Sequence, residues 1–423
     1  MIHASVQSEN GITLGTLRKT FLEGLKACGE RQRVLLIPPD ITRYHSLAGT
    51  LTCWAVEYYG KAVKTILPAL GTHVPMTDQE LDTMYPGIDH TLFAVHDWRH
   101  DVVTIGTVPA EEINRLSEGK LSYSWSAQVN KRLVSGDYDL VLSLGQVVPH
   151  EVIGMANYNK NIFVGTGGSE GINKSHYLGA VYGMERIMGR ADSPVRALMD
   201  YAQEHFAKNI PLEYALTVVA RDKNGAMQPM GLFMGNDRSC YEQAARLSLK
   251  VNFTMVDEPL AKVVVYLQPG EFRTTWLGNK SIYRTRMAIA DGGELIVLAP
   301  GVAHFGEDQE IDRLIRKYGY KGTKRTLEAV SQNDELKNNL SAAAHLIHGS
   351  SEGRFTIRYC PGHMTQQEVE SVGYQYGDLK QMLARYPVGT LQDGWNTDAA
   401  GGRFYYISNP AIGLWAHAGR FYA

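Results

Sequence analysis

The sequence predicts an α/β protein of two domains, with a doubly wound parallel sheet in a larger N-terminal domain and a smaller α/β domain at the C-terminus. Short apolar runs alternate with segments of helical spacing, which is typical of βαβ units. A chain of 423 residues also exceeds the size at which one hydrophobic core stops growing. A break at residues 256–259 predicts a first domain over residues 1–255 and a second over residues 260–403 that closes a substrate cleft. The aromatic tail, residues 404–423, is expected to return to the first domain.

In the first domain, apolar spacing predicts a helix over residues 14–29 and a buried strand over residues 33–40, which Pro38 and Pro39 must end. Thr77 and Glu80 have the spacing of a capping box that opens a helix. The rest of the pattern predicts strands over residues 62–70, 92–97, 102–108 and 139–150, and helices over residues 47–60, 193–206 and 237–249. In the second domain it predicts strands over residues 261–267 and 294–301 and helices over residues 279–289 and 309–318, with residues 345–358 and 371–383 continuing the unit.

Composition excludes several classes of function. A formal net charge of −2 provides no field that would attract nucleic acid or an anionic membrane, so neither is an expected partner. The first residues lack the pattern of a secretion signal, and no run of about 18 apolar residues predicts a membrane span. The 4 cysteines are scattered without a Cys-x-x-Cys pair, which fits a reducing compartment. We therefore expect a cytoplasmic protein.

Polar side chains follow the predicted strands at the ends where ligands of parallel sheets gather. Asp40, Arg43, His73, Asp97 and His150 all fall at such carboxyl ends. Asp40 has a structural explanation, as a turn cap paired with Arg43, and a functional one, in which Arg43 clamps a substrate carboxylate or phosphate. The convergence of these side chains favours a binding site.

The segment 145–179 is dense in Gly and Asn and contains His150, Lys160 and His176. A base, an amine and a second imidazole this close together indicate a site, although spacing alone does not show that they share it. Metal ligation is only weakly indicated, because the two histidines lie 26 residues apart without a recognised ligand pattern.

Other motifs give weaker signals. Residues 165–171, GTGGSEG, fail the dinucleotide fingerprint because Glu170 stands where a glycine is required, although the turn suits a phosphate. His96 favours a structural role, since it and Asp97 point opposite ways in a strand. No role is assigned to the loop histidines His45, His304 and His363.

Five anchors, taken in order, resemble those of lactate racemase and its relatives, the nickel-pincer-nucleotide enzymes. The resemblance covers about residues 30–310, and its anchors are Asp40-x-Thr42-Arg43, Gly71-x-His73, Pro149-His150, Lys160 and His176. It implies an isomerase that inverts C2 of a 2-hydroxy acid by reversible hydride transfer to its cofactor. That cofactor is pyridinium-3,5-bisthiocarboxylic acid mononucleotide carrying nickel.

The resemblance also implies a role for each matching residue. Lys160 would tether the cofactor through a thioamide, and His176 would complete the square plane of the nickel. Asp40 and Thr42 would bind the cofactor. His73 and His150 would be the acid and the base, so that each enantiomer of the substrate has its own base. Substrate would be held by Arg43, Tyr283 and Arg284. The implied partners are a small 2-hydroxy acid and cofactor-maturation enzymes.

Two departures from the family pattern concern the substrate. Lactate enzymes of the family carry Gly-Gly-Arg-Lys at the tether, whereas this chain has Asn157-Tyr158-Asn159-Lys160. The family's Tyr-Gln-x-x-Lys motif appears as Tyr283-Arg284-Thr285-Arg286-Met287. The hydrogen-bonding groups at 157–159, 283 and 284 favour a polyhydroxy acid over lactate, with D-gluconate epimerised at C2 as the best candidate. The alternatives are a nicotinamide-dependent 2-hydroxy-acid dehydrogenase, disfavoured by the failed fingerprint, and a non-catalytic sugar-acid-binding protein, disfavoured by two titratable bases.

Overall fold

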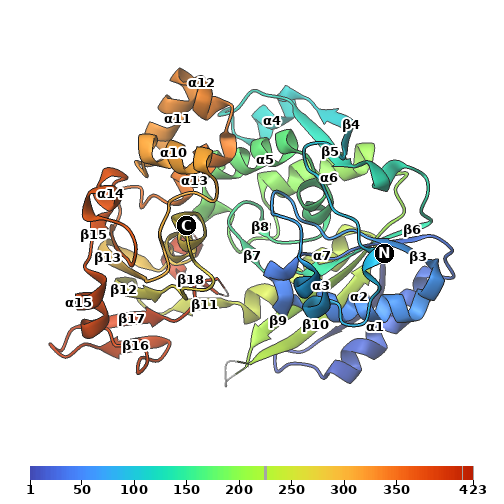
Figure 1. The fold of residues 1–423 in the computed structure, drawn as a ribbon, viewed down its shortest axis with the longest axis horizontal. Helices are drawn as coiled ribbons and strands as arrows, with labels where there is room; N and C mark the ends of the chain where they lie inside the picture. The colour runs from blue at the N-terminus through green and yellow to red at the C-terminus, as the bar shows by residue number, and fades with distance from the viewer. Residues whose placement is uncertain (223–225, 412, 423) are drawn as a thin grey trace. The chain divides into compact units, whose positions relative to one another are not determined.

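The computed structural model describes residues 1–222, 226–411 and 413–422, which form two compact units (Figure 1). The first unit consists of residues 1–178 and 188–252, and the second of residues 179–187 and 253–423. The α/β fold class is confirmed. The segment 179–187 belongs to the second unit because Glu185 binds the guanidinium groups of Arg286 and Arg354, each at 2.9 Å. No sequence pattern predicts that exchange.

The first unit is built on a six-stranded mixed sheet in the order β1-β10-β9-β6-β2-β3. β9, β6, β2 and β3 are parallel, whereas β10 and β1 extend the sheet by antiparallel pairings. Two antiparallel hairpins, β4–β5 and β7–β8, lie outside this sheet. The strands are β1 (Ile2–Gln7), β2 (Val34–Ile37), β3 (Val63–Ile66), β4 (Val102–Val108), β5 (Trp125–Asn130), β6 (Leu140–Gln146), β7 (Pro149–His150), β8 (Gly154–Met155), β9 (Leu212–Arg221) and β10 (Met227–Gly235).

Helices cover both faces of this sheet. α1 and α2 pack on one face through Leu17, Phe21 and Leu51, and α7 packs on the other through Leu247, which lies against Gly231. The α-helices of this unit are α1 (Leu14–Cys28), α2 (Ala48–Tyr59), α3 (Asp78–Met84), α4 (Ala110–Leu116), α5 (Ser169–Tyr182), α6 (Pro194–Phe206) and α7 (Arg238–Val251). Of these, α5 continues past residue 178 into the second unit. The shorter helical turns are η1 (Ile41–Ser46), η2 (Gly60–Ala62), η3 (His90–Leu92), η4 (Lys131–Val134), the π-helix η5 (Asn161–Gly165) and η6 (Met184–Arg186), the last of which belongs to the second unit.

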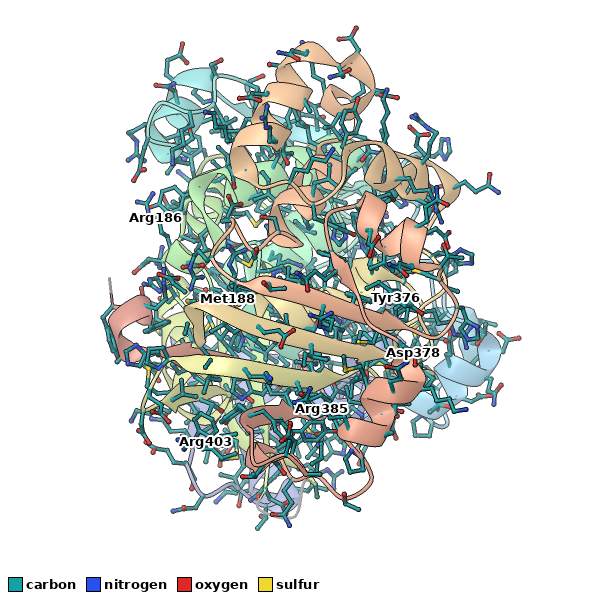
Figure 2. The ribbon with its side chains drawn as sticks, turned by 90° about the vertical axis from the view of Figure 1, so that its left-hand side faces the viewer. Arg186, Met188, Tyr376, Asp378, Arg385 and Arg403 are labelled. Carbon is teal, nitrogen blue, oxygen red and sulfur yellow. The ribbon has the colours of Figure 1, made fainter. Side chains whose placement is uncertain are left out.

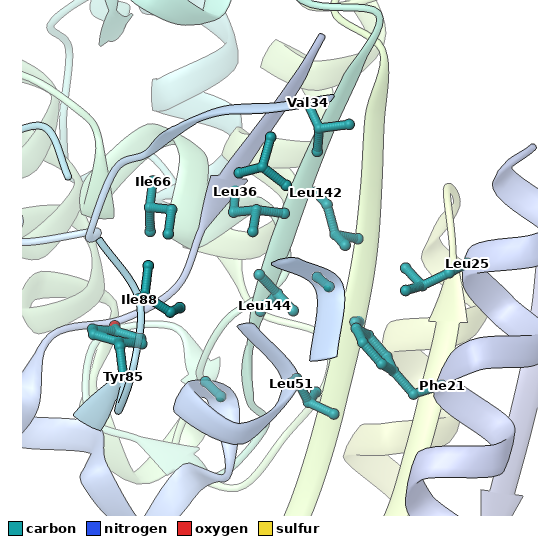
Figure 3. Packing of buried hydrophobic residues seen from close by; sticks show 14 of the residues in the cluster. Phe21, Leu25, Val34, Leu36, Leu51, Ile66, Tyr85, Ile88, Leu142 and Leu144 are labelled. Atoms are coloured by element: carbon teal, nitrogen blue, oxygen red, sulfur yellow. The ribbon is translucent and has the colours of Figure 1, made fainter. Parts of the chain in front are cut away.

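The core of the first unit lies between the sheet and helices α1 and α2 (Figure 3). Leu36 of β2 and Leu142 and Leu144 of β6 are fully buried, as are Phe21 and Leu25 of α1. The parallel strands β2 and β6 are therefore buried along almost their whole length, and apolar side chains recur at helical spacing on α1, as the sequence predicts.

Several predicted elements match their bounds closely. Gly29 ends α1 with φ of 81°, which glycine adopts without strain. The capping box of Thr77 and Glu80 is present at the start of α3.

The predicted strand at 92–97 is wrong: the chain makes the turn η3 there, and only Phe93 forms an isolated bridge, to Ile66. The predicted strand at 102–108 exists as β4 but pairs with β5 outside the main sheet.

The second unit has its own six-stranded sheet, in the order β15-β14-β13-β12-β17-β16. Its strands run parallel except β16. The strands of this unit are β11 (Phe253–Val256), β12 (Leu260–Tyr266), β13 (Ile289–Ala299), β14 (Thr356–Pro361), β15 (Gln375–Tyr376), β16 (Gly394–Thr397), β17 (Arg403–Ile407) and β18 (Leu414–His417).

The α-helices of the second unit include α15, which Asp378 caps at its start and which ends at Arg385 (Figure 2). The guanidinium of Arg385 binds Asp398. They are α8 (Thr275–Gly278), α9 (Lys280–Tyr283), α10 (Gln309–Tyr318), α11 (Thr323–Gln332), α12 (Asp334–Lys337), α13 (Leu340–His348), α14 (Gln366–Ser371), α15 (Leu379–Arg385) and α16 (Ala418–Phe421). The helix predicted over 279–289 ends at Tyr283, and the one predicted over 309–318 has the predicted bounds.

The aromatic tail, residues 404–423, makes its strand pairings in the second unit. β17 pairs with β12 in the main sheet, and β18 pairs with β11. The predicted return of this tail to the first domain did not include these pairings. The tail's strands are too short for the sequence to indicate which strands they pair with. Over the described parts of the chain, no helix has the length and apolar character needed to span a membrane.

Two glycines at equivalent helix positions give a matched test of packing. Gly49 is the second residue of α2, and a Cβ there would lie 2.2 Å from the carbonyl oxygen of Met84. Gly15 is the second residue of α1, and a Cβ there would meet only the Thr13 hydroxyl, at 3.7 Å. We expect Gly49→Ala to destabilise the protein by about 1–3 kcal/mol, because backbone must move. Gly15→Ala should be neutral or stabilise by up to about 1 kcal/mol. Urea unfolding measures both, and equal effects would contradict the packing.

Candidate active site

Three predicted site residues follow three neighbouring parallel strands of the first unit. Asp40 comes after β2, His73 after β3, and His150 lies in β7, after β6. Because β6, β2 and β3 are adjacent in the sheet, their carboxyl ends meet at one edge. The edge is extended by a bridge between Pro39 and Ala69 beyond the ends of β2 and β3. The sheet therefore brings these loops together.

Asp40 and His73 form a hydrogen-bonded pair. Nδ1 of His73 lies 2.6 Å from a carboxylate oxygen of Asp40, and the hydroxyl of Thr42 donates to the other oxygen at 2.5 Å. Burial of Asp40 opposes its ionisation, yet the hydrogen bonds from His73 and Thr42 and the charge of Arg43 together hold the pKa of this carboxyl below its usual value. An ionised Asp40 fixes Nδ1 of His73 as the donor, so Nε2 of the exposed ring is left as the base.

The π-helix η5 is fastened to the same edge of the sheet. The Asn161 amide donates to the carbonyl of Ile37, the last residue of β2, at 3.2 Å and to the hydroxyl of Ser143, in the middle of β6, at 3.0 Å. The Gly71 amide donates to the Gly165 carbonyl at 2.8 Å. Lys160 stands at the N-cap of this helix, so the π-helix fixes the backbone from which its amine projects. Single-turn π-helices are frequent at functional sites.

Lys160 has the electrostatics of a reactive amine. Burial and the nearby charge of Arg43 lower its pKa to about 8, with Glu151 opposing the shift. Within the described residues, Nζ of Lys160 has no hydrogen-bond or ion-pair partner. A half-buried lysine with a lowered pKa and no structural partner is well suited to covalent attachment of a ligand.

The lowered pKa of Lys160 predicts a pH dependence of labelling. Only the neutral amine attacks an acylating reagent, so the labelling rate of Lys160 should rise with pH up to about 8 and then level off. Acetic anhydride labelling of cofactor-free protein, followed by peptide mass spectrometry, measures this rate, with the exposed Lys19 as control. A rate for Lys160 that still climbs steeply above pH 9–10, roughly as an ordinary lysine does, would contradict the assignment.

His150 is buried and is held in one tautomer. The Val152 amide donates to its Nδ1 at 3.1 Å, so the neutral ring carries its proton on Nε2. Burial is the largest cause that holds the pKa of His150 well below its usual value. The positive charges of Lys160, Arg43 and His176 act in the same direction, and Glu151 opposes them. The imidazole of His150 is therefore neutral at physiological pH, with Nε2–H as its available donor.

His176 lies on α5 and presents one nitrogen as a potential ligand. Its Nδ1 donates to the Ile172 carbonyl at 2.7 Å, which leaves the lone pair of Nε2 unprotonated. Burial, followed by the charge of Lys160, lowers the pKa of His176 to about 4. A neutral imidazole whose other nitrogen donates to a carbonyl is the usual arrangement of a metal-ligating histidine. The charges of Lys160 and His176 act on the pKa of His150, and the charge of Lys160 acts on that of His176, so these three side chains lie near one another.

The loop that leads into Lys160 has a strained backbone. Asn157 and Tyr158 are consecutive left-handed residues, with φ of 63° and 57°. This conformation is unfavourable for a bulky side chain and persists only where surrounding contacts impose it. It stands where the resemblance to the lactate enzymes places two glycines, which adopt such angles freely.

Arg196 of α6 supplies those contacts. Its fully buried guanidinium donates to the carbonyls of Met155 at 2.9 Å and Asn157 at 3.2 Å, and to the side chain of Asn159. The ring of Tyr158 stacks on Tyr241 with centroids 5.3 Å apart. The Asn159 amide in turn donates to Asp200 at 2.7 Å. Arg196 and Glu151 are not among the site residues that the sequence predicts. The departure at 157–159 was the available signal for Arg196, and adjacency to His150 was the signal for Glu151.

Of the remaining candidates in the first unit, Arg43 lies near His150 and Lys160, whereas Asp97 and His96 make other contacts. Arg43 is half-buried at a kink inside η1 and its charge acts on both His150 and Lys160. Asp97 does not join the site but accepts the amides of Arg99 and His100. His96 is structural, as predicted, because its nitrogens contact the Gly167 carbonyl and the Asn130 amide, each at 3.0 Å.

The glycines of the segment 165–171 are required by packing. A Cβ on Gly167 would lie 2.0 Å from the Phe163 carbonyl oxygen, and one on Gly168 would lie 2.4 Å from the Gln128 side chain. α5 begins at Ser169, so the run joins two helices rather than forming an open loop. These close approaches account for the glycines without a bound nucleotide.

Tyr283 and Arg284 belong to the second unit and are buried there. The guanidinium of Arg284 donates to the Gly413 carbonyl at 3.1 Å, and the ring of Tyr283 lies edge-on to His348. Their role as substrate contacts stays a prediction. Tyr158 and Asn159, expected to line a pocket, are instead buried in the loop network around Arg196.

Residues 20–187 match a protein-family model described as the lactate racemase N-terminal domain. The fold is similar to that of the lactate racemase apoprotein from Thermoanaerobacterium thermosaccharolyticum, with a TM-score of 0.72, 16% identity, and coverage of 98% of this chain and 94% of that one. It is also similar to a crystallised protein from Thermotoga maritima, with a TM-score of 0.75, 22% identity, and coverage of 96% and 100%. No curated protein matches the chain. The chain therefore shares the fold of these two structures, and residues 20–187 are similar to the lactate racemase N-terminal domain.

Proposed function

We propose that this chain is a member of the lactate racemase family and an isomerase that inverts C2 of a 2-hydroxy acid by reversible hydride transfer. The observation that carries the proposal is the shared site of His150, Lys160 and His176, in which an amine without a structural partner lies among imidazoles held neutral. The match of residues 20–187 to the lactate racemase N-terminal domain agrees with it.

The residues present fit a nickel-pincer nucleotide. Lys160 offers a reactive amine for the thioamide tether, and His176 offers an unprotonated Nε2 for nickel. When bound, the nickel-pincer nucleotide supplies a hydride acceptor next to the substrate carbon. The carboxylate of Asp40 already accepts hydrogen bonds from His73 and Thr42, so the predicted contacts of Asp40 and Thr42 with the nucleotide would be additional to these bonds.

The hydrogen bonds place the proton on opposite ring nitrogens of the two imidazoles, Nδ1 in His73 and Nε2 in His150, which assigns their first roles. Nε2 of His73, backed by Asp40, takes the hydroxyl proton of the substrate. Nε2–H of His150 donates a hydrogen bond to the same oxygen as it becomes a carbonyl. For the opposite enantiomer the roles exchange, and His150 must then release the Val152 amide to become a base. Arg43 orients the substrate carboxylate through charge-assisted hydrogen bonds.

The proposed substrate is a polyhydroxy acid, with D-gluconate epimerised at C2 as the preferred case. Supporting it are the departures from the lactate pattern at Arg284 and Met287. Tyr158 and Asn159 do not add to this support, because they are buried in the loop network around Arg196. Arg284 would serve as a substrate contact only if its guanidinium turned from the Gly413 carbonyl. Further proposed partners of the chain are enzymes that build the cofactor, as the resemblance to the nickel-pincer-nucleotide enzymes implies. We place the protein in the cytoplasm because its four cysteines are free thiols.

A panel of 2-hydroxy acids carrying deuterium at C2 tests the reaction and the substrate together. Protein matured with its cofactor enzymes should invert C2 of gluconate with the label retained, because a hydride does not exchange with water. Loss of the label to solvent would refute hydride transfer. Turnover of lactate alone would refute the polyhydroxy-acid assignment while leaving the isomerase assignment intact.

A further inference from the structure

A second cluster of metal-binding side chains lies in the first unit, formed by His3, Cys28 and Glu213. Nε2 of His3, Sγ of Cys28 and a carboxylate oxygen of Glu213 all lie within 4.8 Å of one another. Cys28 is 5% exposed, and the side chains of His3 and Glu213 are 15% and 12% exposed. Imidazole, thiolate and carboxylate are the three side-chain ligands that zinc takes in proteins.

The fold assembles this cluster from three separate elements. His3 is the extra residue of an irregularity in β1, since Ile2 pairs with Gly235 and Ala4 with Met234. Cys28 is the last residue of α1, and Glu213 is the second residue of β9. β10 separates β1 from β9 and contributes Gly235 beside Tyr214, so no side chain of residue 235 stands between His3 and Glu213.

The thiol of Cys28 differs from the other three cysteines in its surroundings. Cys240 donates to the Asp237 carbonyl at 3.0 Å, and longer contacts join Cys53 to Pro86 and Cys360 to Arg358. In the part of the chain that the structure describes, Sγ of Cys28 has no hydrogen-bond partner. It is a buried sulfur beside an imidazole–carboxylate pair, and His3 and Glu213 are already joined at 2.9 Å.

We propose that His3, Cys28 and Glu213 bind a thiophilic divalent cation of the zinc type, separate from the proposed nickel site. A thiolate, a carboxylate and a neutral imidazole offset the charge of such a cation. The Cys28 thiol proton passes to solvent as the sulfur binds, and water takes the open position. The Asn236 amide, which donates to the second Glu213 oxygen at 3.3 Å, orients that carboxylate. The Arg31 guanidinium near Cys28 is held by the carbonyls of Cys28 and Asp139. The bound ion would crosslink β1 and the C-terminal end of α1 to β9.

Cobalt(II) is the probe for this site, because a cobalt–thiolate bond produces a charge-transfer band in the near ultraviolet. Chelator-treated, cofactor-free protein should bind one equivalent of cobalt with this band, and zinc should displace it. Cys28→Ser should abolish the band, and His3→Gln should weaken cobalt binding at least about tenfold. The matched control, Cys53→Ser, should keep the band, as should His176→Ala, which removes the proposed nickel ligand.

Two results would overturn the proposal. One is the absence of a thiolate band in the wild-type protein, and the other is a band that survives Cys28→Ser. His3 is at the edge of the sheet, so His3→Gln keeps the test decisive if Cys28→Ser does not fold. Because cofactor-free protein is used, failure here leaves the hydride-transfer proposal untouched, and failure of that proposal leaves this site untouched.

Discussion

His150→Gln is expected to lower the rate of C2 inversion by matured protein by about 10²–10⁴-fold, the usual contribution of a positioned acid or base. His150 is buried among the charges of Lys160, Arg43 and His176, and its Nδ1 accepts the Val152 amide. Glutamine keeps an N–H donor of similar reach but cannot transfer a proton. Inversion rates measured from each enantiomer of the substrate quantify the loss.

The comparison with His150→Ala separates two possible roles of this side chain. If His150 transfers a proton for one enantiomer, the glutamine and alanine variants should lose similar activity. If it only donates a hydrogen bond, the glutamine variant should retain much more activity than the alanine variant. His45→Gln, at an exposed histidine of the neighbouring turn, is the control and should be close to wild type. Near-wild-type inversion by His150→Gln would contradict an acid–base role.

Arg196→Ala is expected to destabilise the first unit by about 3–5 kcal/mol, which is typical when one partner of a buried charged network is removed. The carbonyls of Met155 and Asn157 and the side chain of Asn159 would lose a donor that is fully buried. The stacked rings of Tyr158 and Tyr241 would also lose the guanidinium 4.1 Å from the Tyr241 centroid. Urea unfolding followed by circular dichroism measures the change.

Two further variants serve as comparisons for Arg196→Ala. Arg196→Lys should rescue little, because an ammonium cannot reproduce the planar fork that reaches two carbonyls and an amide. Arg246→Ala, at an arginine whose side chain is 74% exposed, should change stability by less than about 0.5 kcal/mol. A loss of less than 1 kcal/mol for Arg196→Ala would show that the left-handed pair at 157–158 does not depend on this residue.

The parts of the fold that sequence predicted are those whose signals are local. The spacing of Leu17, Phe21 and Leu25 predicted α1, and the capping box of Thr77 and Glu80 predicted the start of α3. The false strand at 92–97 arose because Leu92–Ala94 is a short apolar run, and such runs do not distinguish a strand from a turn that packs inward. β9 and β10 were missed because their apolar runs follow one another without the helix expected between parallel strands.

The site residues that follow strand ends could be predicted from the sequence, but the hydrogen-bond partners of these residues could not. Asp40, His73 and His150 follow strands that sequence identified, so their convergence follows from the order of the sheet. The hydrogen bonds that decide their protonation join Asp40 to His73 and Val152 to His150, and no spacing rule predicts either. Asn157 hinted at a left-handed turn, since Asn tolerates such angles better than most residues. Its stabilisation by Arg196, some 39 positions later, was visible only in the fold.

The central claim is that Lys160 and His176 together hold a nickel-bearing nucleotide. Peptide mapping and nickel analysis of one preparation, made together with its cofactor-maturation enzymes, test it most directly. We expect a nucleotide-sized adduct on the peptide that contains Lys160, about one nickel per chain, and loss of the adduct in Lys160→Arg but not in Lys174→Arg. Matured protein that carries neither an adduct on Lys160 nor nickel would contradict it.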